Sequence, residues 1–235
     1  MCFRIKPEQL EVEIEAGKLT VDLNQVLRGL SMTRSDADEY LISLIQNLNI
    51  TCKELAQPRA GFSICNDPEF VLESKTLKIA DKEFQLGKII TTMLKKSQAV
   101  VFFIATIGVE VEALSKKYMR NGDALEGYIV DLIGSELAES ATDYLHSYLE
   151  KLVAAEGYGL SNRYSPGYCN WPVSDQQHLF SLMQKVNCGV TINDSSLMSP
   201  VKSVSGILGI GKGMKRVDYK CRLCDDDKCI LRHPY

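Results

Sequence analysis

One long stretch of apolar residues at helical spacing, from about Asp123 to Ala155, most constrains how this chain can fold. The i, i+3, i+4 rhythm persists for roughly eight turns at ~3.6 residues per turn, which predicts one central helix. The apolar members of the stretch are Leu125, Tyr128, Ile129, Leu132, Ile133, Leu137, Ala141, Tyr144, Leu145, Tyr148, Leu149, Leu152 and Val153.

Glu139 interrupts the apolar pattern of this helix. It follows Leu132 by seven residues and Tyr128 by eleven, so it projects on the same face. A carboxylate on a core-facing stripe must be paired or must meet a ligand. The alternative is an edge position from which the side chain reaches solvent.

The first 88 residues mix helical and extended patterns. Ser35 is a plausible N-cap for the second predicted helix. We expect residues 1–88 to form a small amino-terminal α/β subdomain, and residues 89–235 to form the main unit. The predicted elements are a strand near Val12, helices over 21–30 and 34–48, and a meander of short strands at 61–65, 70–73, 76–79 and 82–85.

The rest of the chain alternates helices with strands. The apolar run over 100–107 suits a strand covered on both faces. The fold class predicted is α+β, a long central helix with a twisted antiparallel sheet. The remaining predicted elements are helices over 87–96, 109–120 and 174–186, the last with Ser174 as N-cap, and strands over 189–192, 203–209 and 214–220.

A ten-residue loop, 163–172, concentrates chemistry suited to binding. Pro166 and Gly167 predict a sharp turn, because proline fixes φ and glycine permits a positive φ. Such a turn would hold Arg163 and Tyr168 on either side of one small pocket, where arginine suits a carboxylate and tyrosine offers a flat apolar face. The alternative is a connecting loop whose aromatic side chains fill the core.

The composition argues against several classes of protein. The net charge of −3 gives no general attraction to nucleic acid or to an anionic membrane. The amino terminus lacks the apolar core of a signal peptide, and the longest apolar run, 99–108, is too short to span a bilayer. We therefore expect a cytoplasmic protein whose eight cysteines are reduced thiols or metal ligands.

Two further motifs carry little chemistry. The segment 206–213 approaches a phosphate-binding loop, but Gly213 stands where a Ser or Thr would hold magnesium, so a glycine-rich hairpin is favoured. No nucleophile signature accompanies the three histidines. We expect His146, in the long helix, to serve packing or to lie at the surface.

Cys221, Cys224 and Cys229 form the strongest metal-binding pattern. Thiolates at these spacings can reach one zinc ion or an iron–sulfur cluster, although a closed zinc site needs a fourth ligand. The alternative is three surface thiols. The candidates for a fourth ligand are Cys188, Cys169 and His233.

Three segments together resemble a known family. They are 137–146 (LAESATDYLH), 163–168 (RYSPGY) and 202–206 (KSVSG). They are similar to the activation (reactivation) domain of cobalamin-dependent methionine synthase, here in a stand-alone form. The resemblance covers roughly residues 95–215.

The resemblance implies a cofactor, partners and site residues. The domain of that family binds S-adenosylmethionine and restores an enzyme whose cobalamin has oxidised to cob(II)alamin. It implies that Glu139 and Arg163 contact the bound cofactor, with Ser165, Gly167 and Tyr168 in its loop. The implied partners are a synthase lacking its own activation domain, which carries the cobalamin, and a flavodoxin-like electron donor.

The chain also departs from the family pattern. A tyrosine pair near the carboxyl-terminal strand of the family's domain falls here on Arg216 and Val217, and an acidic contact from its amino-terminal arm has no counterpart. The cysteine cluster resembles only stand-alone relatives. Two other functions therefore stay open: a metal or iron–sulfur protein that reduces corrinoid proteins without S-adenosylmethionine, and a scaffold that does not bind the cofactor.

Overall fold

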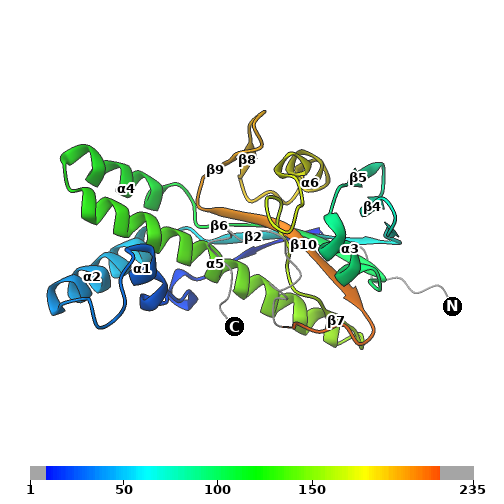
Figure 1. Cartoon of the computed structure of the whole chain (residues 1–235), viewed down its shortest axis with the longest axis horizontal. Helices are drawn as coiled ribbons and strands as arrows, with labels where there is room; N and C mark the ends of the chain where they lie inside the picture. The colour runs from blue at the N-terminus through cyan, green and yellow to red at the C-terminus, as the bar shows by residue number, and fades with distance from the viewer. Residues whose placement is uncertain (1–8, 218–235) are drawn as a thin grey trace.

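The computed structural model describes residues 9–217 and is built on the long helix that the sequence predicts (Figure 1). This helix, α5, covers Ala124–Ala154 and contains 31 residues. It follows α4 (Glu110–Asn121), which ends at Gly122 with a φ of 94°, the left-handed conformation that glycine adopts readily. Contacts between α4 and α5 make an antiparallel helix pair at one end of the molecule (Figure 1).

The main sheet is antiparallel and has five strands in the order β1-β2-β6-β10-β7. All eight residues of the strand β6 are buried, as the unbroken apolar run predicts. The five strands are β1 (Gln9–Glu13), β2 (Arg59–Asn66), β6 (Ala99–Thr106), β7 (Gly159–Leu160) and β10 (Ser203–Gly211).

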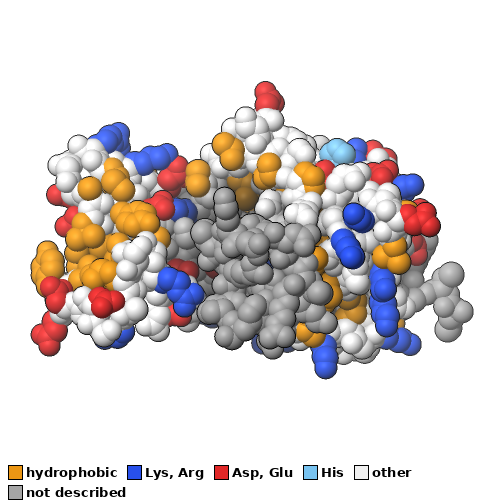
Figure 2. Space-filling model, in the orientation of Figure 1, with side chains coloured by type: hydrophobic (Ala, Val, Ile, Leu, Met, Phe, Trp, Pro, Cys, Tyr) orange, Lys and Arg blue, Asp and Glu red, His pale blue; other side chains and the backbone are white. Residues whose placement is uncertain are grey.

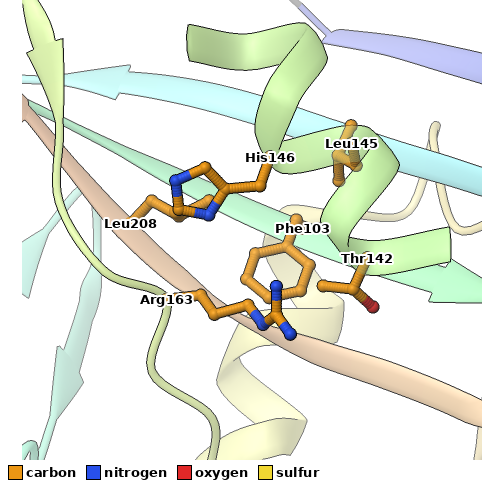
Figure 3. Close-up of a pocket in the computed structure, with 6 residues that line it drawn as sticks. All are labelled: Phe103, Thr142, Leu145, His146, Arg163 and Leu208. Atoms are coloured by element: carbon orange, nitrogen blue, oxygen red, sulfur yellow. The ribbon is translucent and has the colours of Figure 1, made fainter. Parts of the chain in front are cut away.

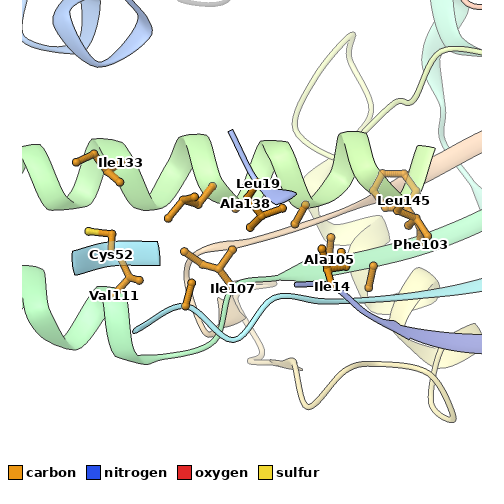
Figure 4. Packing of buried hydrophobic residues seen from close by; sticks show 14 of the residues in the cluster. Ile14, Leu19, Cys52, Phe103, Ala105, Ile107, Val111, Ile133, Ala138 and Leu145 are labelled. Atoms are coloured by element: carbon orange, nitrogen blue, oxygen red, sulfur yellow. The ribbon is translucent and has the colours of Figure 1, made fainter. Parts of the chain in front are cut away.

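Alternation along β6 gives the protein two hydrophobic cores. Val101, Phe103 and Ala105 belong to the larger core, which α5 covers with residues such as Ile133 and Leu145 (Figure 4). The intervening residues Val100, Phe102 and Ile104 belong to the second core on the opposite face. Successive side chains of a strand point to opposite faces, so one apolar run can serve both cores.

The amino-terminal helices extend the larger core. They are η1 (Ala16–Lys18), α1 (Leu23–Gly29) and α2 (Glu39–Leu55), and both α1 and α2 contact α5. The expectation that Ser35 caps α2 is wrong. Asp38 is the cap, because its Oδ1 accepts from the Leu41 amide at 2.8 Å, whereas Asp36 closes a turn with Thr33.

Short elements cover the second core. The predicted meander is confirmed as a three-stranded sheet, although β2 belongs to the main sheet and not to the meander. The helix expected over 174–186 is shorter and has no side-chain cap, because residues 173–175 form a 3₁₀ turn. These elements are β3 (Glu69–Val71), β4 (Thr76–Ile79), β5 (Lys82–Phe84), α3 (Gly87–Leu94), η2 (Val173–Asp175), α6 (Gln176–Leu182), β8 (Thr191–Ile192) and β9 (Met198–Ser199).

The predicted fold class is confirmed: a long helix packs on a curled antiparallel sheet. Division of the chain near residue 88 stays a prediction, and strands from both sides of that position share the main sheet. Residues 206–211 lie within β10 and residues 212–213 turn, so no helix N-terminus follows the glycine-rich segment there. Residues 214–217 are not a strand, and 218–220 lie outside the described residues. None of the helices within 9–217 is both long and apolar enough to cross a membrane.

Candidate functional site

The loop after α5 contains the turn that its Pro-Gly pair predicts. The carbonyl of Ser165 accepts from the Tyr168 amide at 3.3 Å, and Gly167 has a φ of 95°. Proline at the second position and a positive φ at the third define a type II turn. Two further backbone bonds, from Gly167 to the carbonyl of Trp171 at 2.7 Å and from Trp171 to that of Tyr168 at 2.9 Å, close the loop.

Aromatic side chains anchor the loop to the second core. Tyr164 and Trp171 are both buried, and Tyr164 exchanges two backbone hydrogen bonds with Ile207 of β10, at 3.0 and 2.8 Å. The indole of Trp171 donates to Asp175 at 3.0 Å, and the same carboxylate oxygen accepts from the Gln85 amide at 2.6 Å. The core-filling role considered for this loop is therefore real, and it fixes the position of Arg163.

Arg163 reaches back from this loop to α5. Its Nη2 donates to Oε2 of Glu139 at 2.8 Å, and its Nη1 donates to Oδ1 of Asp143. Its side chain is only 16% exposed, whereas that of Glu139 is 53% exposed. Glu139 thus lies at the edge of the apolar face, and it is paired, as its place in the helical pattern requires.

A shallow pocket lies where Arg163 crosses between α5 and the sheet (Figure 3). Its other walls are Phe103, Thr142, Leu145, His146 and Leu208. Its lining is apolar except for the guanidinium, the imidazole and the hydroxyl, and in this structure it is too narrow to admit a water molecule.

Gly206 of β10 permits the close approach that shapes this site. A Cβ atom on it would lie 2.3 Å from the carbonyl oxygen of Tyr164 and 2.9 Å from the ring of Phe103. The loop and the ring could not both keep their places beside a larger residue.

The structure brings together some of the predicted site residues and separates others. Glu139 and Arg163 are in contact, and Ser165 and Gly167 form the turn beside them. Tyr168, which is 47% exposed, does not line the pocket with Arg163. That both side chains border one small pocket therefore stays a prediction.

Three residues beside Arg163 were not assigned to the site from the sequence: Asp143, His146 and Arg216. Asp143 and His146 follow Glu139 by four and seven residues, a helical spacing that could have revealed them. Arg216 lies with its Nη2 3.6 Å from Oδ1 of Asp143. The side-chain amide of Asn162 donates to the Val217 carbonyl at 2.7 Å, and its Oδ1 accepts from the Val217 backbone amide at 2.8 Å, so this segment lies beside the site.

His146 has the most unusual surroundings of these residues. Its side chain is 2% exposed, and its Nε2 lies 3.4 Å from Oε1 of Glu150. Burial lowers the pKa of His146, and the cationic Arg216 and Arg163 lower it further, against the opposing effect of Glu150 and Asp143. The imidazole is therefore neutral near pH 7.

A larger pocket lies at the end of the molecule where Figure 2 shows apolar side chains gathered over α1, α2 and α4. Its volume is about 380 Å³. None of the predicted site residues lies in it, so it is separate from the site at Arg163. Its lining consists of Leu30, Met32, Asp36, Asp38, Tyr40, Leu41 and Leu125.

Some of the predicted metal ligands lie within residues 9–217, which the structure describes, and others lie outside them. Cys221, Cys224, Cys229 and His233 lie outside the described residues. Within residues 9–217, no group of three or more His, Cys, Asp or Glu side chains could hold a metal ion. Cys188 is buried, and desolvation raises the pKa of its thiol to about 12, which disfavours the thiolate that a metal needs.

Comparisons with known proteins agree with this fold. Among solved structures, the chain is similar to a crystal structure of the MetH reactivation domain bound to AdoHcy, with a TM-score of 0.64 and 17% identity. The match covers 86% of this chain and 78% of that chain. The family model described as "Vitamin B12 dependent methionine synthase, activation domain" matches residues 73–229, about two thirds of the sequence. This chain therefore belongs to the activation-domain family of vitamin B12-dependent methionine synthase.

Proposed function

We propose that this chain binds S-adenosylmethionine beside Arg163 and supports the reductive remethylation of cob(II)alamin on a separate cobalamin-dependent methionine synthase. The observation that carries the proposal is the pairing of Arg163 with Glu139 at 2.8 Å, at the mouth of an apolar pocket. Family membership supports the role, and the similar reactivation domain was crystallised with AdoHcy.

The charges of the site suit the amino-acid end of this ligand. S-adenosylmethionine carries a carboxylate and an ammonium, which the Arg163 guanidinium and the Glu139 carboxylate would bind respectively. Without ligand, the two side chains satisfy each other. Binding would replace the pair between Arg163 and Glu139 by one pair from each of them to the ligand, so neither charge is left unpaired, while Asp143 would stay beside the guanidinium. Ser165, Gly167 and Tyr168, in the adjoining turn, are the proposed contacts of the loop.

The chemistry asks little of the protein beyond positioning. S-adenosylmethionine supplies a methyl group that its sulfonium already activates. A flavodoxin-like donor would supply the electron that reduces cob(II)alamin on the partner, and the reduced cobalt would take the methyl as the sulfur–carbon bond breaks, leaving the neutral thioether of S-adenosylhomocysteine. Arg163 and Glu139 would hold the ligand in one orientation for this step.

Calorimetric titration tests the binding step. S-adenosylmethionine is titrated into the wild type, into Arg163→Ala and into Arg34→Ala, a control that removes an exposed arginine outside the site. Loss of a charge-assisted pair should weaken binding by about 2–4 kcal/mol, roughly 30- to 1000-fold, in Arg163→Ala alone. An absence of wild-type binding would rule out direct cofactor binding by the isolated chain.

The partner requirement is tested by reconstitution. The isolated chain should be silent in a methyl-transfer assay, whereas addition of a synthase in the cob(II)alamin form, with reduced flavodoxin, should restore methylcobalamin. The measurement is the visible spectrum of the corrinoid over time. Equal recovery with and without this chain would contradict the accessory role.

We also propose that Cys221, Cys224 and Cys229 hold a metal, because their spacing supplies three thiolates within nine residues. The metal separates the two functions that the sequence leaves open. Stoichiometric iron and a brown colour would favour a corrinoid-protein reductase that does not use S-adenosylmethionine. Zinc, or no metal, in purified protein would favour the reactivation role. Elemental analysis of the purified protein measures this directly.

A further inference from the structure

Polar side chains follow one face of α5 past Arg163. Glu139, Asp143, His146 and Glu150 recur at intervals of four, three and four residues, so they lie along one stripe of the helix. Arg163 bonds to the first two of them. His146 is the next along the stripe, and its ring enters the same pocket as the Arg163 side chain (Figure 3).

His146 is a buried polar group whose bonding capacity is unused. Both ring nitrogens are buried and have no hydrogen-bond partner. Glu150 is 3.4 Å from Nε2 without making a hydrogen bond, and its side chain is 46% exposed to water. Buried polar atoms are nearly always bonded, and leaving one unpaired costs about 1–3 kcal/mol.

The other polar groups in the pocket lining are satisfied. The hydroxyl of Thr142 donates to the Ala138 carbonyl at 2.9 Å, and Arg163 is held by its two carboxylates. The remaining walls, Phe103, Leu145 and Leu208, are apolar. The imidazole is thus the group in this lining that a ligand can satisfy.

We propose that His146 is a further ligand-contacting residue of this site, hydrogen-bonding the nucleoside part of a bound S-adenosyl ligand. This inference rests on the proposed function. His146 lies seven residues beyond Glu139, about 10 Å along the helix at 1.5 Å per residue. With its amino-acid end at Glu139 and Arg163, the ligand extends along α5 and brings its nucleoside to His146.

The chemistry of the pocket agrees with a nucleoside. A neutral imidazole donates from one nitrogen and accepts at the other, as the hydroxyls and amine of adenosine require. Phe103, Leu145 and Leu208 are nearly fully buried around the imidazole, so a nucleoside that reaches it would form its hydrogen bond in apolar surroundings. Burial, and after it the cationic Arg216 and Arg163, lower the pKa of His146 and so favour the neutral imidazole.

Titration with two ligands distinguishes the contribution of the amino-acid end of the site from that of the nucleoside end. S-adenosylhomocysteine has both ends, whereas 5′-methylthioadenosine keeps the nucleoside and lacks the amino acid. His146→Leu should weaken both ligands by about 5- to 10-fold, the effect of one hydrogen bond, and His146→Asn should recover part of the loss. Arg163→Ala should weaken S-adenosylhomocysteine far more than 5′-methylthioadenosine. His178→Asn, a change outside the pocket, is the matched control.

The outcomes of these titrations are distinct. If the wild type binds S-adenosylhomocysteine and His146→Leu binds it equally well, this inference is overturned and the proposed function stands. Failure of the wild type to bind either ligand overturns both. If His146→Leu does not fold, imidazole NMR of the wild type decides, since the chain has only three histidines. Ligand-induced shifts of the His146 nitrogens support the contact, and unchanged shifts at saturation contradict it.

Discussion

Arg163 and Glu139 are 24 residues apart in the sequence, and their side chains form a 2.8 Å hydrogen bond at the edge of α5. The arginine comes from a loop held by the second core, and the glutamate comes from a helix that covers the first. Because each element is fixed by its own packing, the guanidinium of Arg163 and the carboxylate of Glu139 are held at a defined separation without a ligand.

Arg163→Lys should behave almost as Arg163→Ala does toward S-adenosylmethionine. Lysine keeps the charge, but it lacks the planar fork that now bonds to Glu139 and Asp143 with separate nitrogens. We expect at least about 10-fold weaker binding by calorimetry. Wild-type affinity in the lysine variant would show that charge alone, and not the fork, recognises the ligand.

The two carboxylates that bond Arg163 should have opposite effects on binding. Glu139→Gln removes the proposed partner of the ligand's ammonium and should weaken binding about 10-fold or more. Asp143→Asn should strengthen binding by a few-fold, because Asp143 competes with the ligand's carboxylate for the guanidinium. Equal losses in the two isosteric variants, each titrated with S-adenosylmethionine, would contradict this division of roles.

Gly206→Ala should destabilise the fold. The added Cβ would meet the Tyr164 carbonyl oxygen at 2.3 Å and the Phe103 ring at 2.9 Å. Overpacking of this kind costs about 1–3 kcal/mol of unfolding free energy, measurable by urea denaturation. Gly17→Ala is the matched control, since a Cβ there meets nothing within 4 Å, and it should change stability by less than about 0.5 kcal/mol.

Asp175 should be a stabilising residue for the Arg163 loop. Its carboxylate is 8% exposed and bonds both the Trp171 indole, at 3.0 Å, and the Gln85 amide, at 2.6 Å. Asp175→Ala leaves the buried Trp171 indole and the part-buried Gln85 amide without their acceptor and should lower the unfolding free energy by about 2–3 kcal/mol. Asp175→Asn keeps one acceptor oxygen and should lose less, so an equal loss in both variants would argue against this role.

Acidification should weaken the fold through His146. The pKa of His146 lies below the ordinary 6.5 in the folded chain. Near pH 6.5 the unfolded chain therefore binds more protons at this residue than the folded chain does. The unfolding free energy should therefore fall as pH drops from about 7.5 through 6.5 toward 5.5. Glu150 and Asp143 oppose this effect, and Arg163 and Arg216 reinforce it.

Denaturation of His146→Asn measures that contribution. The variant should show a flatter dependence of unfolding free energy on pH between about 7.5 and 5.5, because the histidine that titrates differently in the two states is gone. Identical slopes in wild type and His146→Asn would mean that the buried imidazole does not govern the acid response.

The sequence by itself determined the features that depend on neighbouring residues. Helical spacing predicted α5, an unbroken apolar run predicted β6, and Pro166-Gly167 predicted the type II turn. Each of these depends on the preferences of a few consecutive residues, so the sequence expresses them locally. The position of Glu139 in the helical pattern likewise predicted a carboxylate that needs a partner.

Only the tertiary structure decided which segments meet. The strand β2 joins the main sheet instead of the meander that follows it, and the loop after α5 brings Arg163 to Glu139 and Asp143. Asp143 and His146 lie beside Arg163 only because the loop places the arginine against their face of α5. Which distant segments come into contact depends on the packing free energy of both hydrophobic cores together. A local pattern of residues does not contain that information.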